Sequence, residues 1–277
     1  MLLAALLSAF TLSQATQGVA VPRDASLPPS AEQAKAALDS SPRHGEYVDV
    51  PMAGGPAIKT WVSYPERMDK AGVVIVIQEV FGLTDWLRGV ADQLAKEGFI
   101  AVAPDMVSGF GPGGGGTDSV GSRDDVVALV RKITPDESMR RLNAVRAWAL
   151  KIPAGSGKVA TLGFCWGGGQ SFAYAGAQPA LNAAVVYYGT SPEPPILDAI
   201  QAPVLGLYGG DDARVDATVP PAQEQMKKLG KSYEVHTYDG AGHGFLRDQS
   251  GRDGANLKAT QQAWPRTVSF LKEKVGG

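Results

Sequence analysis

The stretch of sequence that decides the fold is KVATLGFCWGGG, residues 158–169. Its first part, Lys158 to Leu162, predicts a β-strand, and small residues from Gly168 onward open a helix. Between them, Gly163-Phe164-Cys165-Trp166-Gly167 matches the G-x-nucleophile-x-G turn that joins a strand to a helix. The glycines let strand and helix approach closely because they carry no side chain. Cys165 is therefore a candidate nucleophile, and a buried cysteine packed as a small hydrophobe is the alternative.

The chain on both sides of this turn alternates between strand-like and helix-like segments. Apolar, β-branched runs predict further strands at 72–77, 99–103, 183–188, 204–208 and 233–238. Helical patterns lie at 84–96, 118–130, 135–150, 221–229 and 257–274. Two earlier strand-like stretches, 47–51 and 58–64, predict an antiparallel hairpin at one sheet edge. Together these segments predict an α/β fold, with a mostly parallel twisted sheet, helices on both faces and the ligand site at the carboxyl ends of the strands.

A nucleophile in such a turn needs an acid and a histidine, which follow it in that chain order. Asp212 lies in the loop that directly follows the strand-like run 204–208, and we prefer it to Asp211 as the acid. Asp216 is a third carboxylate nearby, and any of the three could cap a helix or turn instead. His243 lies between glycines in the loop after the next strand, whereas the alternation of residues 233–238 places His236 in the middle of that strand. We therefore expect His243 to be the base.

The remaining requirement of such a site is a pair of backbone N–H groups that stabilise an oxyanion. The amides of Trp166, after the nucleophile, and Val80, after an earlier strand, occupy the expected positions. Glu79 precedes Val80 and should therefore lie close to Cys165. A carboxylate there raises the pKa of the sulfur by like-charge repulsion, which disfavours the thiolate. The presence of Glu79 therefore suggests that it has a role in the site. A cap on the helix that begins near Thr84 is the alternative.

Four motifs together resemble the dienelactone hydrolase family, the carboxymethylenebutenolidases, over about residues 46–275. They are Gln78-Glu79-Val80-Phe81-Gly82, Gly163-Phe164-Cys165-Trp166-Gly167-Gly168, Gly209-Gly210-Asp211-Asp212 and Gly240-Ala241-Gly242-His243-Gly244-Phe245. The resemblance implies an α/β-hydrolase fold and a triad of Cys165, Asp212 and His243 that acts on lactones or activated esters. It also implies that Glu79 holds the resting thiol and accepts its proton when substrate arrives.

The resemblance also implies a substrate site. Arg247 matches a family arginine that binds the substrate carboxylate, a surface arginine being the alternative, and Phe81 is expected in the same site. The family's second arginine has no matching position here, although Arg123 is a stand-in candidate. The loop Gly109 to Gly116 follows a strand and is expected to form a flexible rim, because no Gly-Lys-Ser/Thr follows it as in a phosphate cradle.

Composition excludes several other classes of function. Twenty-six basic and 28 acidic residues give a net charge of −2, which provides no field to gather nucleic acid. A basic cluster on a helical pattern is expected to be a solvated face; it consists of Arg140, Arg141 and Arg146. The three histidines lie at no metal-ligand spacing, so we expect no metal and no cofactor. A single cysteine cannot form an internal disulfide.

The N-terminal segment suggests export. Residues 1–12, MLLAALLSAFTL, are almost wholly apolar and small-x-small exits follow, so residues 1–20 are predicted to be a signal peptide. No Lys or Arg precedes Arg23, so the usual positive region is missing. We expect a periplasmic or secreted protein, or a cytoplasmic one if this segment is not a working signal. Residues 21–45 are expected to form an arm and 46–277 a single hydrolase domain.

The sequence therefore predicts a hydrolase that cleaves a small-molecule lactone or ester through a thioester on Cys165. Three alternatives remain: a general carboxylesterase or thioesterase with the same triad, a non-enzymatic binding protein that inherited the fold, and a redox-sensing thiol. The oligomeric state is open, with a monomer favoured.

Overall fold

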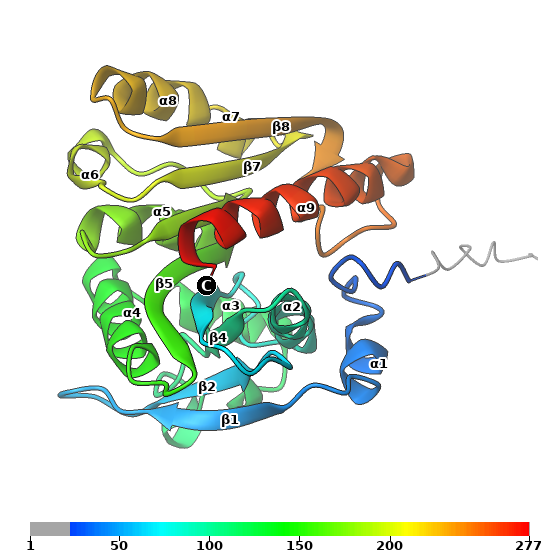
Figure 1. Cartoon of the computed structure of the whole chain (residues 1–277), viewed down its shortest axis with the longest axis vertical. Coiled ribbons are helices and arrows are strands. Elements are labelled where there is room, and N and C mark those ends of the chain that lie inside the picture. Colours follow the sequence, from blue (N-terminus) through cyan, green and yellow to red (C-terminus); the bar gives the residue numbers. More distant parts are fainter. Residues whose placement is uncertain (1–22, 277) are drawn as a thin grey trace, which may run out of the picture.

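The computed structural model describes residues 23–276. The predicted signal peptide, residues 1–20, lies outside the described residues. The described chain builds one eight-stranded sheet in the order β1-β2-β4-β3-β5-β6-β7-β8 (Figure 1). The strands are β1 Gly45–Val50, β2 Ile58–Ser63, β3 Ala71–Ile77, β4 Ile100–Pro104, β5 Gly155–Phe164, β6 Ala183–Tyr187, β7 Val204–Asp211 and β8 Tyr233–Gly242.

Strand direction in this sheet follows the expectation. β1 and β2 form an antiparallel hairpin, with Glu46 opposite Val62, and β2 also runs antiparallel to β4. Every other neighbouring pair of strands is parallel. The mostly parallel sheet with an antiparallel hairpin at one edge is therefore confirmed.

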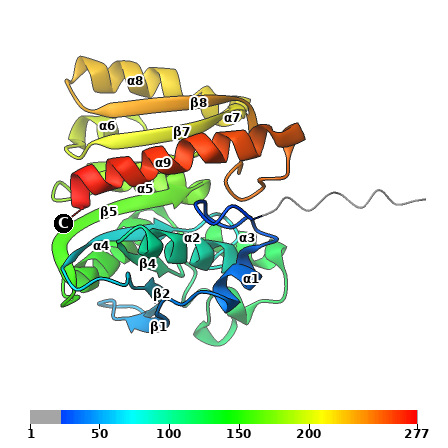
Figure 2. The same cartoon turned by 45° about the vertical axis from the view of Figure 1, so that its right-hand side comes forward.

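Helices cover both faces of the sheet (Figure 2). The helices are α1 Ala34–Asp39, α2 Asp85–Lys96, α3 Arg123–Val130, α4 Pro135–Ala149, α5 Trp166–Ala177, α6 Pro194–Ala199, α7 Ala213–Asp216, α8 Val219–Lys228 and α9 Ala255–Val275. Apolar residues of α1, α2 and α9 pack in one core cluster, and those of α3, α4, α5, α6 and α8 pack in another.

The central strand β3 shows why both faces must be covered. All seven of its residues are buried. Successive side chains of a strand point to opposite faces, so Val73 and Ile75 enter one cluster while Val74 and Val76 enter the other. A strand whose residues are all apolar therefore buries both of its faces only when a layer of helices packs on each side of the sheet.

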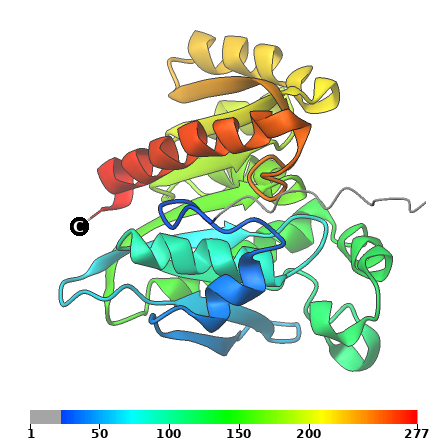
Figure 3. The ribbon, with the colours of Figure 1, turned by 90° about the vertical axis from the view of Figure 1, so that its right-hand side faces the viewer.

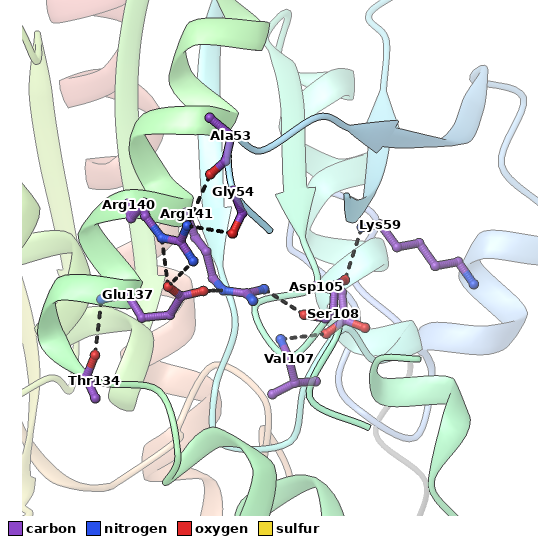
Figure 4. A network of polar contacts seen from close by, with 10 residues as sticks. All are labelled: Ala53, Gly54, Lys59, Asp105, Val107, Ser108, Thr134, Glu137, Arg140 and Arg141. Carbon is purple, nitrogen blue, oxygen red and sulfur yellow. Dashed lines mark hydrogen bonds and ion pairs between the residues drawn. The ribbon is translucent and has the colours of Figure 1, made fainter. Parts of the chain in front are cut away.

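The structure corrects two details of the sequence interpretation. The helix expected from Asp118 begins five residues later, at Arg123, because the Ser122 side chain accepts a hydrogen bond from the Asp125 N–H and caps it. Residues 117–119 form a short 3-10 turn instead. Arg141, expected on a solvated face, is 2% exposed. Its guanidinium lies 2.6 Å from Glu137 and donates to the Ser108 carbonyl, and these partners compensate its burial (Figure 4).

Residues 23–44 pack against the hydrolase domain rather than extending away from it. The segment before α1 passes between α2 and the loop that leads to α9 (Figures 1 and 3). Leu27 and Ala34 are buried in the core cluster of α2 and α9. We call residues 23–33 the arm.

The parallel strands bring distant segments to one edge of the sheet. The carboxyl ends of β3, β5, β6, β7 and β8 are followed by Gln78, Cys165, Tyr188, Asp212 and His243. Since neighbouring parallel strands end at the same edge of the sheet, these residues and the loops that follow them lie along that edge. Among residues 23–276, we find no helix with the length and apolar character needed to cross a membrane.

Candidate active site

Cys165 lies in a strained turn between β5 and α5. Its φ of 56° and ψ of −119° are unusual for a residue with a side chain. The adjoining glycines make this turn possible. A Cβ on Gly163 would lie 1.9 Å from the Gly167 carbonyl oxygen, and one on Gly167 would lie 2.3 Å from that of Gln78. The turn therefore projects Cys165 at the carboxyl edge while its neighbours pack backbone against backbone.

The surroundings of Cys165 favour the neutral thiol. Burial raises the pKa of the Cys165 thiol, and the negative charge of Glu79 raises it further. The backbone N–H groups of Trp166 and Val80 act on the sulfur in the opposite direction and lower its pKa. The structure therefore brings both predicted oxyanion-hole amides to Cys165, together with the predicted carboxylate.

Asp212 and His243 form a close pair. Nδ1 of His243 lies 2.5 Å from Oδ2 of Asp212, which is almost wholly buried. Asp212 precedes α7 but its side chain makes no capping hydrogen bond there, so its carboxylate faces the histidine instead. Asp211 points elsewhere and pairs with the exposed Arg252. His236, the competing histidine, lies in β8 and contacts Glu234.

Glu79 is buried and paired with Arg247. Only 4% of Glu79 is exposed, and its Oε2 lies 2.9 Å from Nε of Arg247. Burial raises the pKa of the Glu79 carboxyl to about 7, against the positive charges of Arg247 and Arg123. Glu79 does not cap α2, because the Thr84 side chain accepts the capping hydrogen bond from the Leu87 N–H. This carboxylate is therefore available to the site.

Two arginines from distant segments meet at Phe81. The Arg123 guanidinium, from α3, lies 4.4 Å from the centre of the Phe81 ring, and that of Arg247 lies 5.3 Å from it. Cations over an aromatic face are held by its quadrupole. Arg123, Arg247 and Phe81 thus form a basic group beside Glu79 with the chemistry to hold an anion.

The sequence interpretation missed Tyr188. Its φ of 39° is also unusual, and its ring centre lies 5.1 Å from that of His243. Burial raises the pKa of Tyr188 well above its ordinary value, and the charge of Glu79 acts in the same direction. Its buried hydroxyl has no hydrogen-bond partner within residues 23–276. Its position directly after β6 was the available signal, because strand ends at this edge border the site.

The glycine-rich loop 109–116 is tied to the segment that carries Glu79. Asp105, at the end of β4, accepts hydrogen bonds from the N–H groups of Val107 and Thr117 (Figure 4 shows the first). The Thr117 hydroxyl in turn accepts from the Leu83 N–H at 3.0 Å. The loop is therefore anchored at both ends, and one anchor contacts the chain just after Phe81. Within the described part of the chain, no cluster of three or more His, Cys, Asp or Glu side chains could hold a metal ion.

A mostly parallel sheet covered on both faces, with a strained cysteine turn between β5 and α5, is the fold of an α/β-hydrolase. The sequence model of the dienelactone hydrolase family matches residues 58–275. The chain belongs to this family and is an ester hydrolase of the dienelactone hydrolase type. The resemblance seen in the four motifs is thereby confirmed.

Individual relatives agree with this assignment. A protein of Salmonella typhimurium named "Putative carboxymethylenebutenolidase" is 30% identical over 234 residues, which cover 80% of this chain and 85% of that protein. A protein of Methylorubrum extorquens with the same name is 30% identical over 262 residues, with 88% and 86% covered.

Solved structures show the same architecture. The crystal structure of a protein named as a putative dienelactone hydrolase from Klebsiella pneumoniae matches with a TM-score of 0.72 and 27% identity, covering 83% of this chain and 98% of that one. A dienelactone hydrolase-like promiscuous phosphotriesterase from metagenomic libraries matches with a TM-score of 0.73 at 24% identity, covering 84% and 99%. The second likeness concerns the fold alone.

Proposed function

We propose that the protein hydrolyses a small lactone or activated ester that carries a carboxylate, by way of a thioester on Cys165. The observation that carries this proposal is the position of Glu79, which contacts Arg247 and also acts on the Cys165 thiol. One carboxylate thus connects an anion-binding arginine to the nucleophile. Burial supports the connection, because it raises the pKa of Glu79 to about 7 and makes the ionised group a competent proton acceptor near neutral pH.

The first step couples substrate binding to activation of the thiol. The substrate carboxylate binds the guanidinium of Arg247, with Arg123 also close to the Phe81 ring, and displaces Glu79 from its ion pair. The Glu79 carboxylate then accepts the proton of Cys165. The resulting thiolate attacks the ring or ester carbonyl, and the N–H groups of Val80 and Trp166 stabilise the oxyanion.

The second step releases the product. The tetrahedral intermediate collapses and the bond between the acyl carbon and the leaving ester oxygen breaks, so that the acyl group remains on sulfur. Glu79 gives the proton that it took from Cys165 to the leaving oxygen. His243, oriented by Asp212, removes a proton from water, which attacks the thioester. Collapse of this second intermediate breaks the carbon–sulfur bond and frees the carboxylic acid, and His243 gives the proton taken from water to the departing sulfur, which restores the Cys165 thiol.

Replacement of the nucleophile tests the mechanism. We expect Cys165→Ala to lower hydrolysis of lactones and aryl esters by roughly a thousandfold or more, because the proposed acyl intermediate forms on this sulfur. Circular dichroism and thermal unfolding provide the control that the fold is retained. Wild-type-like activity in the folded variant would contradict the proposal.

A second measurement looks for the intermediate and the substrate class. In His243→Ala, acylation should outrun deacylation, and intact-mass spectrometry should show the acyl mass on the peptide that contains Cys165. A panel of lactones, aryl esters and thioesters, each with and without a carboxylate, then separates a dienelactone-type enzyme from a general carboxylesterase or thioesterase. Equal rates for charged and uncharged members would favour the general esterase.

A further inference from the structure

We infer that the arm, residues 23–33, positions Arg247 and thereby sets the preference for substrates that carry a carboxylate. This inference rests on the proposed function of the same site. The arm lies before residue 58, where the match to the dienelactone hydrolase family begins, so the family assignment says nothing of it.

The arm contacts the backbone of the loop that carries Arg247. The Ala31 N–H donates a hydrogen bond to the Arg247 carbonyl at 3.0 Å. Two residues further on, the buried Gln249 side chain donates from Nε2 to the Pro28 carbonyl of the arm at 2.9 Å and to the Leu246 carbonyl at 3.1 Å. The arm therefore holds this loop at Arg247 itself and two residues after it.

The arm is itself fixed to α2. Nζ of Lys96 lies 2.6 Å from the Ala25 carbonyl oxygen, and Gln93 reaches the same oxygen. Pro29 packs so closely on α2 that a Cβ on Gly89 would lie 2.7 Å from its Cγ. Residues 27–30 of the arm are buried, and such packing leaves this part of the arm little freedom to move relative to the helix.

A further tie lies beyond α1, where the chain returns to the same helix. The Arg43 guanidinium binds the Asp92 carboxylate with both Nε and Nη2, at 2.9 and 2.6 Å, and the Ser41 hydroxyl also donates to it. Such two-point pairing fixes geometry as well as position. The chain is thus held to α2 both within the arm and beyond α1.

This arrangement connects the two halves of the Glu79–Arg247 pair. Glu79 lies in the short segment between β3 and α2, and Arg247 lies in the loop between β8 and α9. The arm spans from α2 to that second loop (Figure 3). It therefore fixes the backbone from which Arg247 reaches Glu79, Phe81 and a substrate carboxylate. Loss of this contact should weaken binding of an anionic substrate more than it affects the chemistry at Cys165.

Two variants each remove one hydrogen bond between the arm and the loop that carries Arg247, one from the loop and one from the arm. Gln249→Met removes the donor to the Pro28 carbonyl, and Ala31→Pro removes the N–H that binds the Arg247 carbonyl. Ala31 opens the turn that leads into α1, a position that suits proline because its N–H serves no helix. Lys96→Met is the matched control, because it also removes a side-chain donor to an arm carbonyl, while Gln93 and the packing of Pro29 on Gly89 still hold the arm to α2.

The readout is the ratio of kcat/KM for an aryl ester with a free carboxylate to that for its methyl-capped, uncharged analogue. In both test variants we expect the ratio to fall roughly fivefold, the effect of one net hydrogen bond, through a higher KM for the charged ester. Lys96→Met should stay within about twofold of wild type. Hydrogen exchange of residues 243–249 should quicken in both test variants, a readout that needs no substrate.

The outcomes are distinguishable. A shift in Gln249→Met without one in Ala31→Pro would overturn the role of the arm, because it would trace the effect to the Leu246 carbonyl within the loop. Equal shifts in all three variants would also overturn it. If wild type hydrolysed neither ester, the proposed function would fail, and unchanged exchange of residues 243–249 would separately overturn the positioning.

Discussion

Two neighbouring aspartates at the end of β7 have different partners. Asp212 is almost wholly buried and contacts Nδ1 of His243, whereas Asp211 is exposed and pairs with Arg252. A buried carboxylate fixes the orientation and tautomer of a histidine, and an exposed ion pair contributes little.

This difference predicts unequal effects of the same chemical change. Asp212→Asn should lower kcat for ester hydrolysis by roughly a hundredfold to ten-thousandfold, because an amide cannot stabilise the imidazolium. Asp211→Asn, the matched control, should stay within about twofold of wild type. Steady-state kinetics on one aryl ester decides the matter, and similar losses in both variants would contradict the assignment.

At the scale of single residues, the motifs made most of the site predictable. The glycines around Cys165 and His243, and the strand end before Asp212, placed these residues at one sheet edge. Tyr188 was not predicted as a site residue, because a second tyrosine at the end of an apolar strand has the pattern of a core residue. Arg141 was misjudged because its burial depends on the Ser108 carbonyl, which the sequence places 33 residues away.

The crossing of β5 and α5 is the element on which the site depends. At this crossing the Gly163 position faces the Gly167 carbonyl, and Gly168 lies against the Tyr187 carbonyl. Backbone atoms cannot move aside like the end of a flexible side chain, so strand and helix would have to separate to admit a methyl group.

We therefore expect Gly163→Ala to lower the free energy of unfolding by roughly 3 kcal/mol or more. Gly121→Ala is the control, since a Cβ there would meet no atom within 4 Å; its effect should stay within about 0.5 kcal/mol. Urea unfolding followed by circular dichroism measures both. A loss in Gly163→Ala no larger than in the control would show that the crossing tolerates separation.

Helices and strands were predictable where their apolar pattern was long. They were less predictable where a capping side chain sets the first residue of a helix. β3 and α9 follow from their own residues. The start of α3 depends on whether Ser122 or an earlier residue caps the helix, and periodicity does not distinguish these. The short helices α6 and α7 span six and four residues, too few for a periodic pattern to show.

At the scale of the whole molecule, the order of the strands could only be expected in outline. Alternation of strands and helices predicts a parallel sheet with right-handed crossovers, but not that β4 inserts between β2 and β3. The packing of the arm against the β8–α9 loop could not be predicted either, because the Ala31–Arg247 hydrogen bond joins two backbone groups, which give no residue-specific pattern in the sequence.

The stability of the whole molecule should depend on pH through Glu79. Its carboxyl keeps a proton up to about pH 7 in the folded state, against an ordinary value of 4.5. The folded state therefore binds more protons than the unfolded state between these values, and the free energy of unfolding falls as pH rises from about 4.5 to about 7. The contribution is on the order of 3 kcal/mol.

Comparison with Glu79→Gln isolates this contribution, because the amide does not titrate. We expect the difference in free energy of unfolding between wild type and Glu79→Gln to change by that amount across the window, with wild type losing stability relative to the variant. Urea unfolding at pH 4.5, 6 and 7.5 measures it. A difference that does not vary with pH would refute the elevated pKa.

The raised pKa of Cys165 also has a consequence for how long the protein survives. Peroxides attack thiolates far faster than thiols, and a sequence with one cysteine has no second thiol to convert a sulfenic acid into an internal disulfide. Oxidation at this position would proceed toward irreversible acids. Burial and the neighbouring Glu79 charge both keep the sulfur protonated between turnovers, so we expect Cys165 to resist oxidation best while no substrate is bound.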